Sequence, residues 1–350
     1  MKKLIKYVLI GLVYGSSSVY AQMPHDAVYM PKKTACLAIS YGNSSWKDYW
    51  ENTLKRENLN IGTHTTQSAM VMVAAGITDK LNVIVGLPYI STKANAGNLM
   101  GQKGIQDLSA WVKYKMVEKS GLALHGVVGA SVPVGNYVAE FLPMSIGMGA
   151  KTATGRIIAS YYHKSGIYLA GHASYIFRST VKLDRDAYQA DNRVYNANTA
   201  SVPNATDSRL ALGFSKKGLI AEAFVDGFSC IGGDNIRRND MPFLTNNMRA
   251  TSVGGYAKYQ PKNIGFNVRV AKVIEGLNVG QSMSYMVGVM YQINQSHPQP
   301  LKGSKRAVYK YFILFFIYSF HPSGSRELFL YSLTPLQGLG VCFLYSLALI

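Results

Sequence analysis

The strongest constraint in this sequence is an alternation of apolar and polar residues that recurs along most of its length. About a dozen stretches between residues 34 and 294 have this period of two. The pattern predicts β-strands, because successive side chains of a strand point to opposite faces. In the clearest stretch, residues 264–270, one face carries the apolar residues Ile264, Phe266, Val268 and Val270. No helical period fits these stretches, so the sequence predicts an all-β protein.

The connections between the predicted strands also alternate in length. Five are short turns rich in Gly, Asn, Asp or Pro, at residues 78–80, 118–121, 164–166, 216–218 and 261–263. Six are longer and polar or Gly-rich, at roughly 43–58, 93–103, 135–148, 180–204, 231–247 and 275–281. An even number of strands with one short-turn end and one long-loop end is typical of bacterial outer-membrane barrels.

The predicted fold is therefore a single antiparallel transmembrane β-barrel of about 12 strands over residues 34–294, with short periplasmic turns and longer extracellular loops. Closing the sheet pairs its backbone N–H and C=O groups within the protein. This pairing is required because the hydrocarbon core of the membrane offers them no hydrogen-bond partners. Charged residues make up only 15% of the chain, and the body has no clear apolar span of about 20 residues that would favour a membrane helix. A soluble β-sandwich is the rival fold, but it does not explain the matched connections.

The start of the chain has the features of an export signal. Residues 1–21 have three lysines among the first six positions, then an apolar stretch, and they end in Ala21. This order predicts cleavage before Gln22, export from the cytoplasm and a place in the bacterial outer membrane. Residues 22–33 would then be a short periplasmic segment, and we expect it to be too short to plug the barrel.

The end of the chain departs from the pattern. After residue 295 the alternation is lost, and strongly apolar stretches appear that Pro322 and Pro335 interrupt. We interpret the atypical hydrophobic tail, residues 295–350, as the product of a frameshift or of translation past a lost stop codon. A C-terminal membrane helix is the alternative, although neither half of the tail is a clean span.

Three short motifs in the predicted barrel look like those of a known family. They are Gly76-Ile77-Thr78-Asp79-Lys80-Leu81 leading to Leu87-Pro88-Tyr89, Gly104-Ile105-Gln106-Asp107-Leu108 followed by Lys113-Tyr114, and Val132-Pro133-Val134-Gly135. In this order they resemble the outer-membrane family named for the meta-pathway of phenol degradation, over roughly residues 60–294. The resemblance implies an outer-membrane barrel and passage of small, often aromatic, molecules. It implies no particular functional residues.

Strand phase assigns a set of charged and titratable side chains to the inner face of the barrel. These lumen-lining candidates are Asp107, Lys113, Lys115, His125, Arg156, His172, Arg178, Arg209, Glu222, Asp226, Lys258 and Arg269. Seven are basic, three are acidic and two are His, so we expect a positive lumen that favours anions. A salt-bridged interior without selectivity is the alternative. If Lys217-Gly218 is a two-residue turn, Arg209 faces Asp226 across the strand pair and can neutralise it.

An enzyme is the less favoured hypothesis. His172 and Ser174 are spaced so that both share one strand face, as in barrel lipid hydrolases where a His activates a Ser. Here that face points inward, away from a lipid substrate. The three Cys residues show no metal-like spacing with His, so we expect neither a metal site nor a cofactor.

The sequence therefore favours a route for small molecules, aromatic or anionic solutes among them, across the outer membrane. A structural or adhesive barrel without transport is the alternative. The expected partners are outer-membrane lipid, a small-molecule solute and the barrel-assembly machinery. Export makes nucleic acid an unexpected partner, even though the formal net charge is +18.

Overall fold

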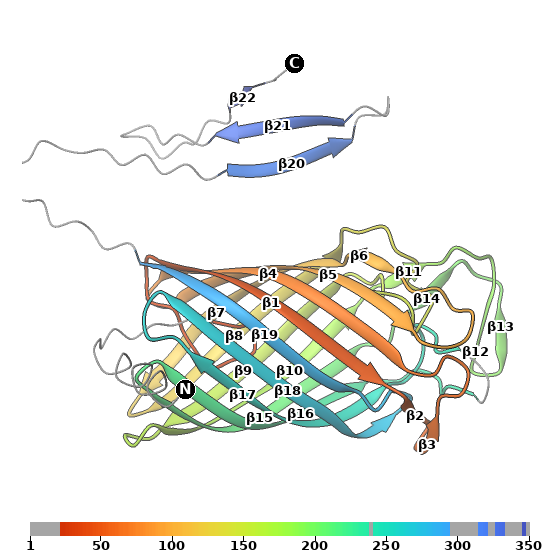
Figure 1. Cartoon of the computed structure of the whole chain (residues 1–350), viewed down its shortest axis with the longest axis horizontal. Coiled ribbons are helices and arrows are strands. Elements are labelled where there is room, and N and C mark those ends of the chain that lie inside the picture. Colours follow the sequence, from red (N-terminus) through yellow and green to blue (C-terminus); the bar gives the residue numbers. More distant parts are fainter. Residues whose placement is uncertain (1–21, 238–240, 295–313, 321–325, 333–344, 348–350) are drawn as a thin grey trace, which may run out of the picture. The chain divides into compact units, whose positions relative to one another are not determined.

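The computed structural model describes residues 22–237, 241–294, 314–320, 326–332 and 345–347. The chain divides into two units, residues 1–295 and 296–350 (Figure 1). The described parts of the second unit are three antiparallel strands, β20 (Leu314–Phe320), β21 (Arg326–Ser332) and β22 (Tyr345–Leu347). These three segments are strands, so they do not form the membrane helix that the sequence left as an alternative. Most of the predicted tail lies outside the described residues. In the described part of the chain, no helix is both long and apolar enough to cross a membrane.

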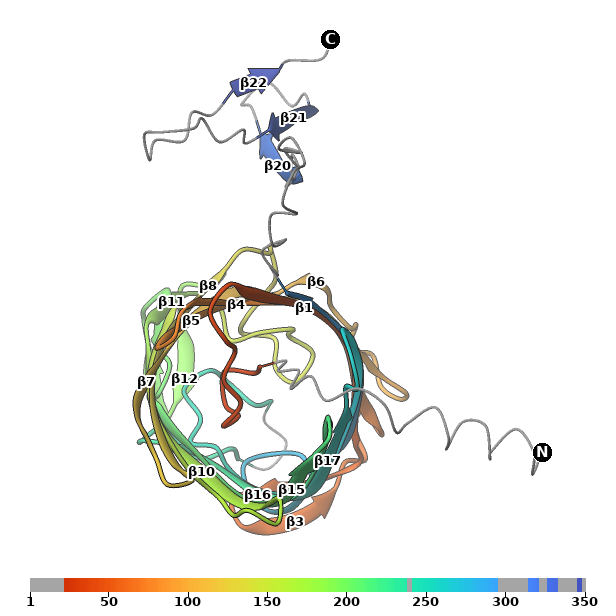
Figure 2. The same ribbon diagram turned by 90° about the vertical axis from the view of Figure 1, so that its left-hand side faces the viewer.

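The first unit is a closed barrel of twelve long antiparallel strands, each paired with its neighbours in the chain (Figures 1 and 2). The strands are β1 (Thr34–Trp46), β4 (His64–Thr78), β5 (Leu81–Ala94), β7 (Asp107–Lys119), β8 (Leu122–Pro133), β9 (Thr152–Tyr162), β10 (Ile167–Arg178), β15 (Ala205–Lys216), β16 (Leu219–Cys230), β17 (Arg249–Tyr259), β18 (Ile264–Leu277) and β19 (Met283–Asn294). Pairing of β1 with both β4 and β19 closes the sheet. The twelve-stranded barrel predicted from sequence is confirmed.

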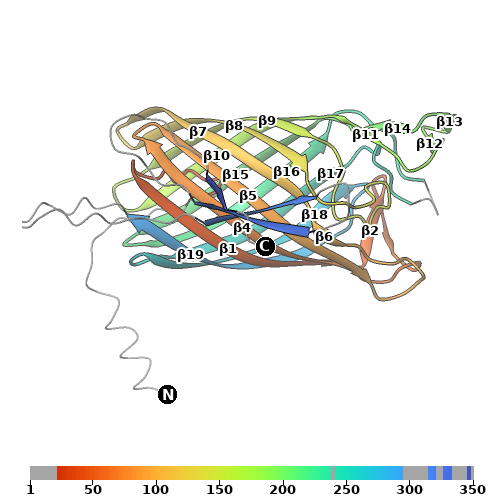
Figure 3. The ribbon, with the colours of Figure 1, turned by 90° about the horizontal axis from the view of Figure 1, so that it is seen from above.

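Short turns and long loops lie at opposite ends of the barrel (Figure 3). Lys217 and Gly218 both have positive φ, 49° and 78°, and form the two-residue turn between β15 and β16. This turn sets the predicted register, in which Arg209 is opposite Asp226. At the other end the long loops contain short strands, namely β2 (Asp48–Glu51), β3 (Leu54–Glu57), β6 (Lys103–Ile105), β11 (Thr180–Lys182), β12 (Tyr188–Ala190), β13 (Arg193–Tyr195) and β14 (Thr199–Ser201).

The two faces of the barrel wall differ in the way the alternation predicts. On β1, Leu37 and Ile39 point outward and are 40% and 54% exposed. Cys36, which directly precedes Leu37, points inward and is 2% exposed. Tyr114, Tyr161 and Tyr291 also point outward, near the short-turn end, and Tyr89, Tyr175 and Phe177 do so near the long-loop end. The outer face is thus an apolar belt with aromatic residues toward both ends, as in membrane barrels.

Three long loops pack together at the long-loop end. They span residues 134–151, 179–204 and 231–248, and their shared core contains Ala139, Ala150, Val181, Leu183, Ala200, Val202 and Leu244. The hydroxyl of Tyr137 donates a hydrogen bond to Asp107 at the end of β7 (2.7 Å) and accepts one from the backbone of Gly149 (3.1 Å). Burial and the bond to Asp107 raise the pKa of Tyr137, so this hydroxyl stays protonated. The loops therefore form an ordered cap anchored on the barrel wall.

The apolar belt predicts a cost for an outward charge that depends on depth. Val128 lies in the middle of β8 and is 69% exposed, while Val132 lies near the long-loop end of the same face. We expect Val128→Arg to lower the free energy of unfolding in phospholipid bilayers by about 2–4 kcal/mol, and Val132→Arg by about 1 kcal/mol or less. Guanidinium titrations of the inserted proteins measure both values. Equal costs at the two positions would contradict a lipid-facing belt.

Candidate functional site

The lumen contains a segment that precedes the first barrel strand. Residues 22–33, here called the N-terminal segment, enter the barrel at the short-turn end and lie inside its outline in the end-on view (Figure 2). The segment bends at a turn that the Asp26 carboxylate caps, accepting hydrogen bonds from the backbone N–H of Met23 (2.8 Å) and of Val28 (3.1 Å). Before β1 the backbone of Pro31 runs against Gly76, where a Cβ atom would collide with the Pro31 carbonyl.

The prediction that this segment is too short to plug the barrel is therefore wrong. Twelve residues can span roughly 40 Å when extended, which exceeds the distance needed to turn back from the barrel rim into the lumen. The segment uses only part of this reach, because the turn at Asp26 folds it on itself. A short segment can thus fill a narrow barrel when the wall offers it partners.

Lys113 on β7 is the main polar anchor of the N-terminal segment. Its side chain is fully buried, and its Nζ atom donates to the carbonyl oxygens of Asp26 (2.6 Å) and Val28 (2.7 Å). The Asp26 carboxylate lies 3.3 Å from the same nitrogen. A fully buried ammonium is costly unless paired and hydrogen-bonded, and these three oxygens supply that pairing.

Further polar contacts fix the rest of the segment. Arg156 on β9 donates to the carbonyl of Pro24 (3.1 Å), and Nδ1 of His172 on β10 lies 3.2 Å from the carbonyl of His25.

The remaining contacts of the segment involve amide, aromatic and apolar side chains. The amides of Gln22 and Asn82 form a hydrogen bond of 2.6 Å. The Tyr29 ring stacks on His125 at 5.5 Å, and Nζ of Lys115 lies 4.6 Å from its centroid. Met30 is fully buried in an apolar cluster with Cys36, Met72, Ala74, Ile84 and Met290.

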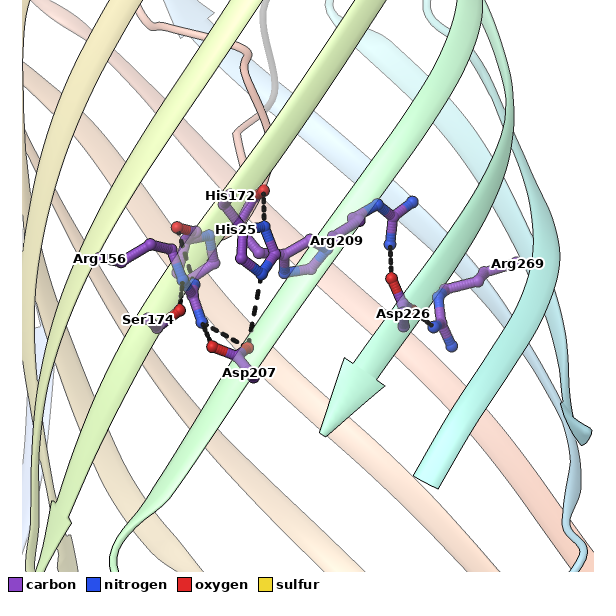
Figure 4. A network of polar contacts seen from close by, with 9 residues as sticks. His25, Arg156, His172, Ser174, Asp207, Arg209, Asp226 and Arg269 are labelled. Atoms are coloured by element: carbon purple, nitrogen blue, oxygen red, sulfur yellow. Dashed lines mark hydrogen bonds and ion pairs between the residues drawn. The ribbon is translucent and has the colours of Figure 1, made fainter. Parts of the chain in front are cut away.

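Beyond the segment, the wall carries a network of ion pairs (Figure 4). Nη2 of Arg156 lies 2.9 Å from Asp207 on β15, and its Nε donates to the Ser174 hydroxyl (2.7 Å). Nε2 of His172 lies 3.5 Å from the same Asp207 carboxylate. The network thus shares Arg156 and His172 with the N-terminal segment, so contacts to the segment and to the wall depend on one another.

A second part of the network lies on β15, β16 and β18. Arg209 contacts Glu222 (3.0 Å) and Asp226 (3.4 Å), and Arg269 contacts Asp226 (2.7 Å). The guanidinium carbons of Arg209 and Arg269 lie 3.9 and 4.7 Å from the Phe224 ring centroid, within cation–π distance. The Arg209–Asp226 contact expected from the predicted turn is present.

The twelve lumen-lining candidates fall into three groups. Five contact the N-terminal segment, namely Lys113, Lys115, His125, Arg156 and His172. Four form the second part of the network, namely Arg209, Glu222, Asp226 and Arg269. Three lie elsewhere: Asp107 under Tyr137, Arg178 donating to the Pro203 carbonyl (3.2 Å), and Lys258, which is buried on β17.

Two carboxylates in this region were missed by the sequence reasoning. Asp207 has the same strand phase as Arg209, so the alternation alone could have identified it. Asp26 lies outside any strand, and no periodic signal marks it. With these two residues included, Lys113, Arg156, Arg209 and Arg269 each have a carboxylate partner. Pairing weakens the positive field expected from the count of basic residues, and anion preference stays a prediction.

The arrangement of His172 and Ser174 does not resemble a nucleophile and its base. The Ser174 hydroxyl accepts from Arg156, while the two ring nitrogens of His172 face the His25 carbonyl and Asp207. Activation of a Ser hydroxyl needs the His ring within hydrogen-bond reach of it. Within the described ranges, no group of three or more His, Cys, Asp or Glu residues is placed to hold a metal ion.

A small cavity lies beside the N-terminal segment. A cavity of about 40 Å³ lies between the segment and the network, bordered by His25, His172, Arg209 and Tyr256 among others. This volume holds about three water molecules rather than a solute. The segment therefore occupies part of the lumen at this level.

Comparison with solved structures identifies barrels of the same kind. The chain is similar to an outer membrane channel from Pseudomonas putida F1, with a TM-score of 0.63 and 12% identity, over 79% of this chain and 100% of that chain. It is also similar to the translocator domain of the autotransporter NalP from Neisseria meningitidis (TM-score 0.44, 12% identity, 83% and 94% covered) and to the NanC porin (0.43, 8%, 73% and 100%). The first likeness shows that the chain has the fold of an outer-membrane barrel.

Sequence comparisons add no relative. No family model matches the chain, and no curated protein matches it.

The ion-pair network predicts a coupled loss of stability. The side chains of Arg209 and Glu222 are only 9% and 13% exposed, so Arg209→Met leaves a nearly buried carboxylate without its cation, with the Tyr168 hydroxyl still donating to it. We expect this change to lower the free energy of unfolding by about 3 kcal/mol. Adding Glu222→Gln should recover part of the loss, because the stranded charge is removed. Denaturant titration of both single variants and the double variant measures the coupling, and strictly additive losses would contradict it.

Proposed function

We propose that this protein is an outer-membrane channel for small molecules whose lumen is closed, in the state described, by its own N-terminal segment. The observation that carries the proposal is the way the segment is held. Its polar contacts to the wall are noncovalent and involve Lys113, Arg156 and His172. Water can replace such partners when the segment leaves, which it cannot do for a continuous apolar core.

Three further observations support this function. The outward face is an apolar belt and the inward face carries the ion-pair network, as expected of a lipid-embedded barrel with an aqueous lumen. The similar protein from Pseudomonas putida F1 is described as an outer membrane channel. Residues 1–21 have the composition of an export signal, which would deliver the chain to the outer membrane. A binding or transport role accounts for these features without catalysis.

The motif resemblance favours small aromatic solutes and a relation to the family named for the meta-pathway of phenol degradation. Parts of the three motifs meet at one place in the wall, while residues 76–81 form the β4–β5 turn at the opposite end. The backbone N–H of Gln106 donates to the carbonyl of Pro88 (3.0 Å), and Gly135 approaches the carbonyl of Ile105 so closely that a Cβ atom would collide with it.

A structural or adhesive barrel is the second candidate, favoured by the ordered cap of loops at the long-loop end. The two functions differ in whether the lumen ever conducts. Outer-membrane fractionation tests the location that both share, and a soluble periplasmic product would contradict both. A measurement of conductance distinguishes the channel from the structural or adhesive barrel.

Weakening the N-terminal segment should open the channel. Asp26→Ala removes the cap of the turn and the carboxylate next to Lys113. Hydrogen bonds to charged groups contribute about 1.5–3 kcal/mol, so we expect at least about a tenfold increase in the open fraction. Planar-bilayer recordings of the purified protein measure it.

The matched control is Asp186→Ala, which changes an exposed aspartate in the loop between β11 and β12. The open fraction of this variant should equal that of the unsubstituted protein. If the protein and its Asp26→Ala variant both fail to conduct any ion or pass any small solute in liposome swelling, the structural role is correct instead.

A further inference from the structure

Lys113 lies beside an apolar pocket in the barrel wall. In the pairing of β5 with β7, Lys113 is opposite Asn82 and Trp111 is opposite Ile84. Residues two apart on a strand share a face and are separated by about 7 Å. Trp111 and Ile84 belong to the apolar cluster in which Met30 is buried. The wall therefore presents one cation and, about one side-chain length away, an apolar surface.

The N-terminal segment fills both features at once. Within the part of the chain that the structure describes, the hydrogen-bond partners of Lys113 Nζ are all segment atoms, including the Asp26 carboxylate. Met30, four residues later, fills the apolar pocket and has no exposed surface. The wall is thus complementary to a negative group joined to an apolar body, and the segment supplies both from its own side chains.

We propose that Lys113 and the adjoining apolar pocket form a binding site for small monocarboxylates with an apolar body, which the N-terminal segment occupies as an internal mimic of the ligand. This inference rests on the proposed function, because the solute must enter the lumen. When the segment leaves, Lys113 loses the Asp26 carboxylate, and the carboxylate of the ligand pairs with the Lys113 ammonium instead. The apolar body of the ligand takes the place of Met30. Binding therefore favours the state in which the segment has left.

The chemistry of the site limits the ligand class. A neutral molecule of the same shape gives Lys113 no counter-charge and so competes poorly with Asp26. A dicarboxylate would bring its second charge against the apolar side chains of Met72, Ala74 and Ile84, which do not compensate for its lost hydration. A monocarboxylate with a short hydrocarbon chain matches both parts.

Cys36 provides a reporter for release of the segment. Its thiol is 2% exposed and packs in the same cluster as Met30. Departure of the segment uncovers it to the lumen, where N-ethylmaleimide can alkylate it. The measurement uses the full chain with Cys230→Ser and Cys342→Ser, so that Cys36 is its single thiol. Hexanoate is the probe, hexanamide is its neutral control, and heat-dependent gel migration verifies folding.

At about ten times its dissociation constant, hexanoate should increase the rate of Cys36 alkylation about tenfold. Hexanamide should leave the rate unchanged. Lys113→Met should abolish the response to hexanoate, whatever the rate of Cys36 alkylation of this variant without hexanoate. Asp26→Asn keeps Lys113 but weakens the competing segment, so the half-maximal hexanoate concentration should fall.

Three outcomes overturn the proposal: equal responses to hexanoate and hexanamide, a response that survives Lys113→Met, or no response in both the parent protein and Asp26→Asn. If Lys113→Met fails to fold, the amide control and Asp26→Asn decide. The alkylation assay needs no conduction. A hexanoate response without any conductance would contradict the channel but support the binding site. Conductance without a hexanoate response would contradict only the binding site.

Discussion

The pairing of β1 with β19 is the constraint on which the rest of this structure depends. Twelve consecutive residue pairs, from Thr34 opposite Asn294 to Ser45 opposite Met283, join the first and last barrel strands. They remove both free edges of the sheet, so the backbone polar groups of the wall find partners within it. They also fix which face is inside, because a slip of one residue would exchange the two faces of β1. The polar lumen and its need for partners follow from this register.

A narrow closed lumen with charged walls requires those charges to be paired or hydrated. Here, pairing within the wall is incomplete. Arg209 and Arg269 find carboxylates on β16, but Lys113 finds its partners on a segment that comes from outside the sheet. The same electrostatic requirement that organises the wall therefore also draws the N-terminal segment inside. Closure and occupancy of the lumen share one physical origin.

Local sequence signals were sufficient to predict the wall. The period of two identified the strands, and the Lys217-Gly218 turn set the register that brings Arg209 opposite Asp226. The contact between Asp26 and Lys113 could not be predicted in this way, because it joins residues 87 positions apart and one of them lies in no periodic element. Charge counting along the strands overlooked it for that reason. Asp207 was overlooked without such a reason, since its phase matches that of Arg209.

The N-terminal segment is covalently joined to β1 at Thr34, and this attachment has a quantitative consequence. A tethered group of this length meets its site at an effective concentration in the millimolar range. A freely diffusing molecule with the same intrinsic affinity must reach a comparable concentration before it occupies the lumen as often as the segment does. For a solute that competes with the segment as proposed, the tether thereby sets a threshold concentration, below which the segment stays in the lumen and above which the solute displaces it.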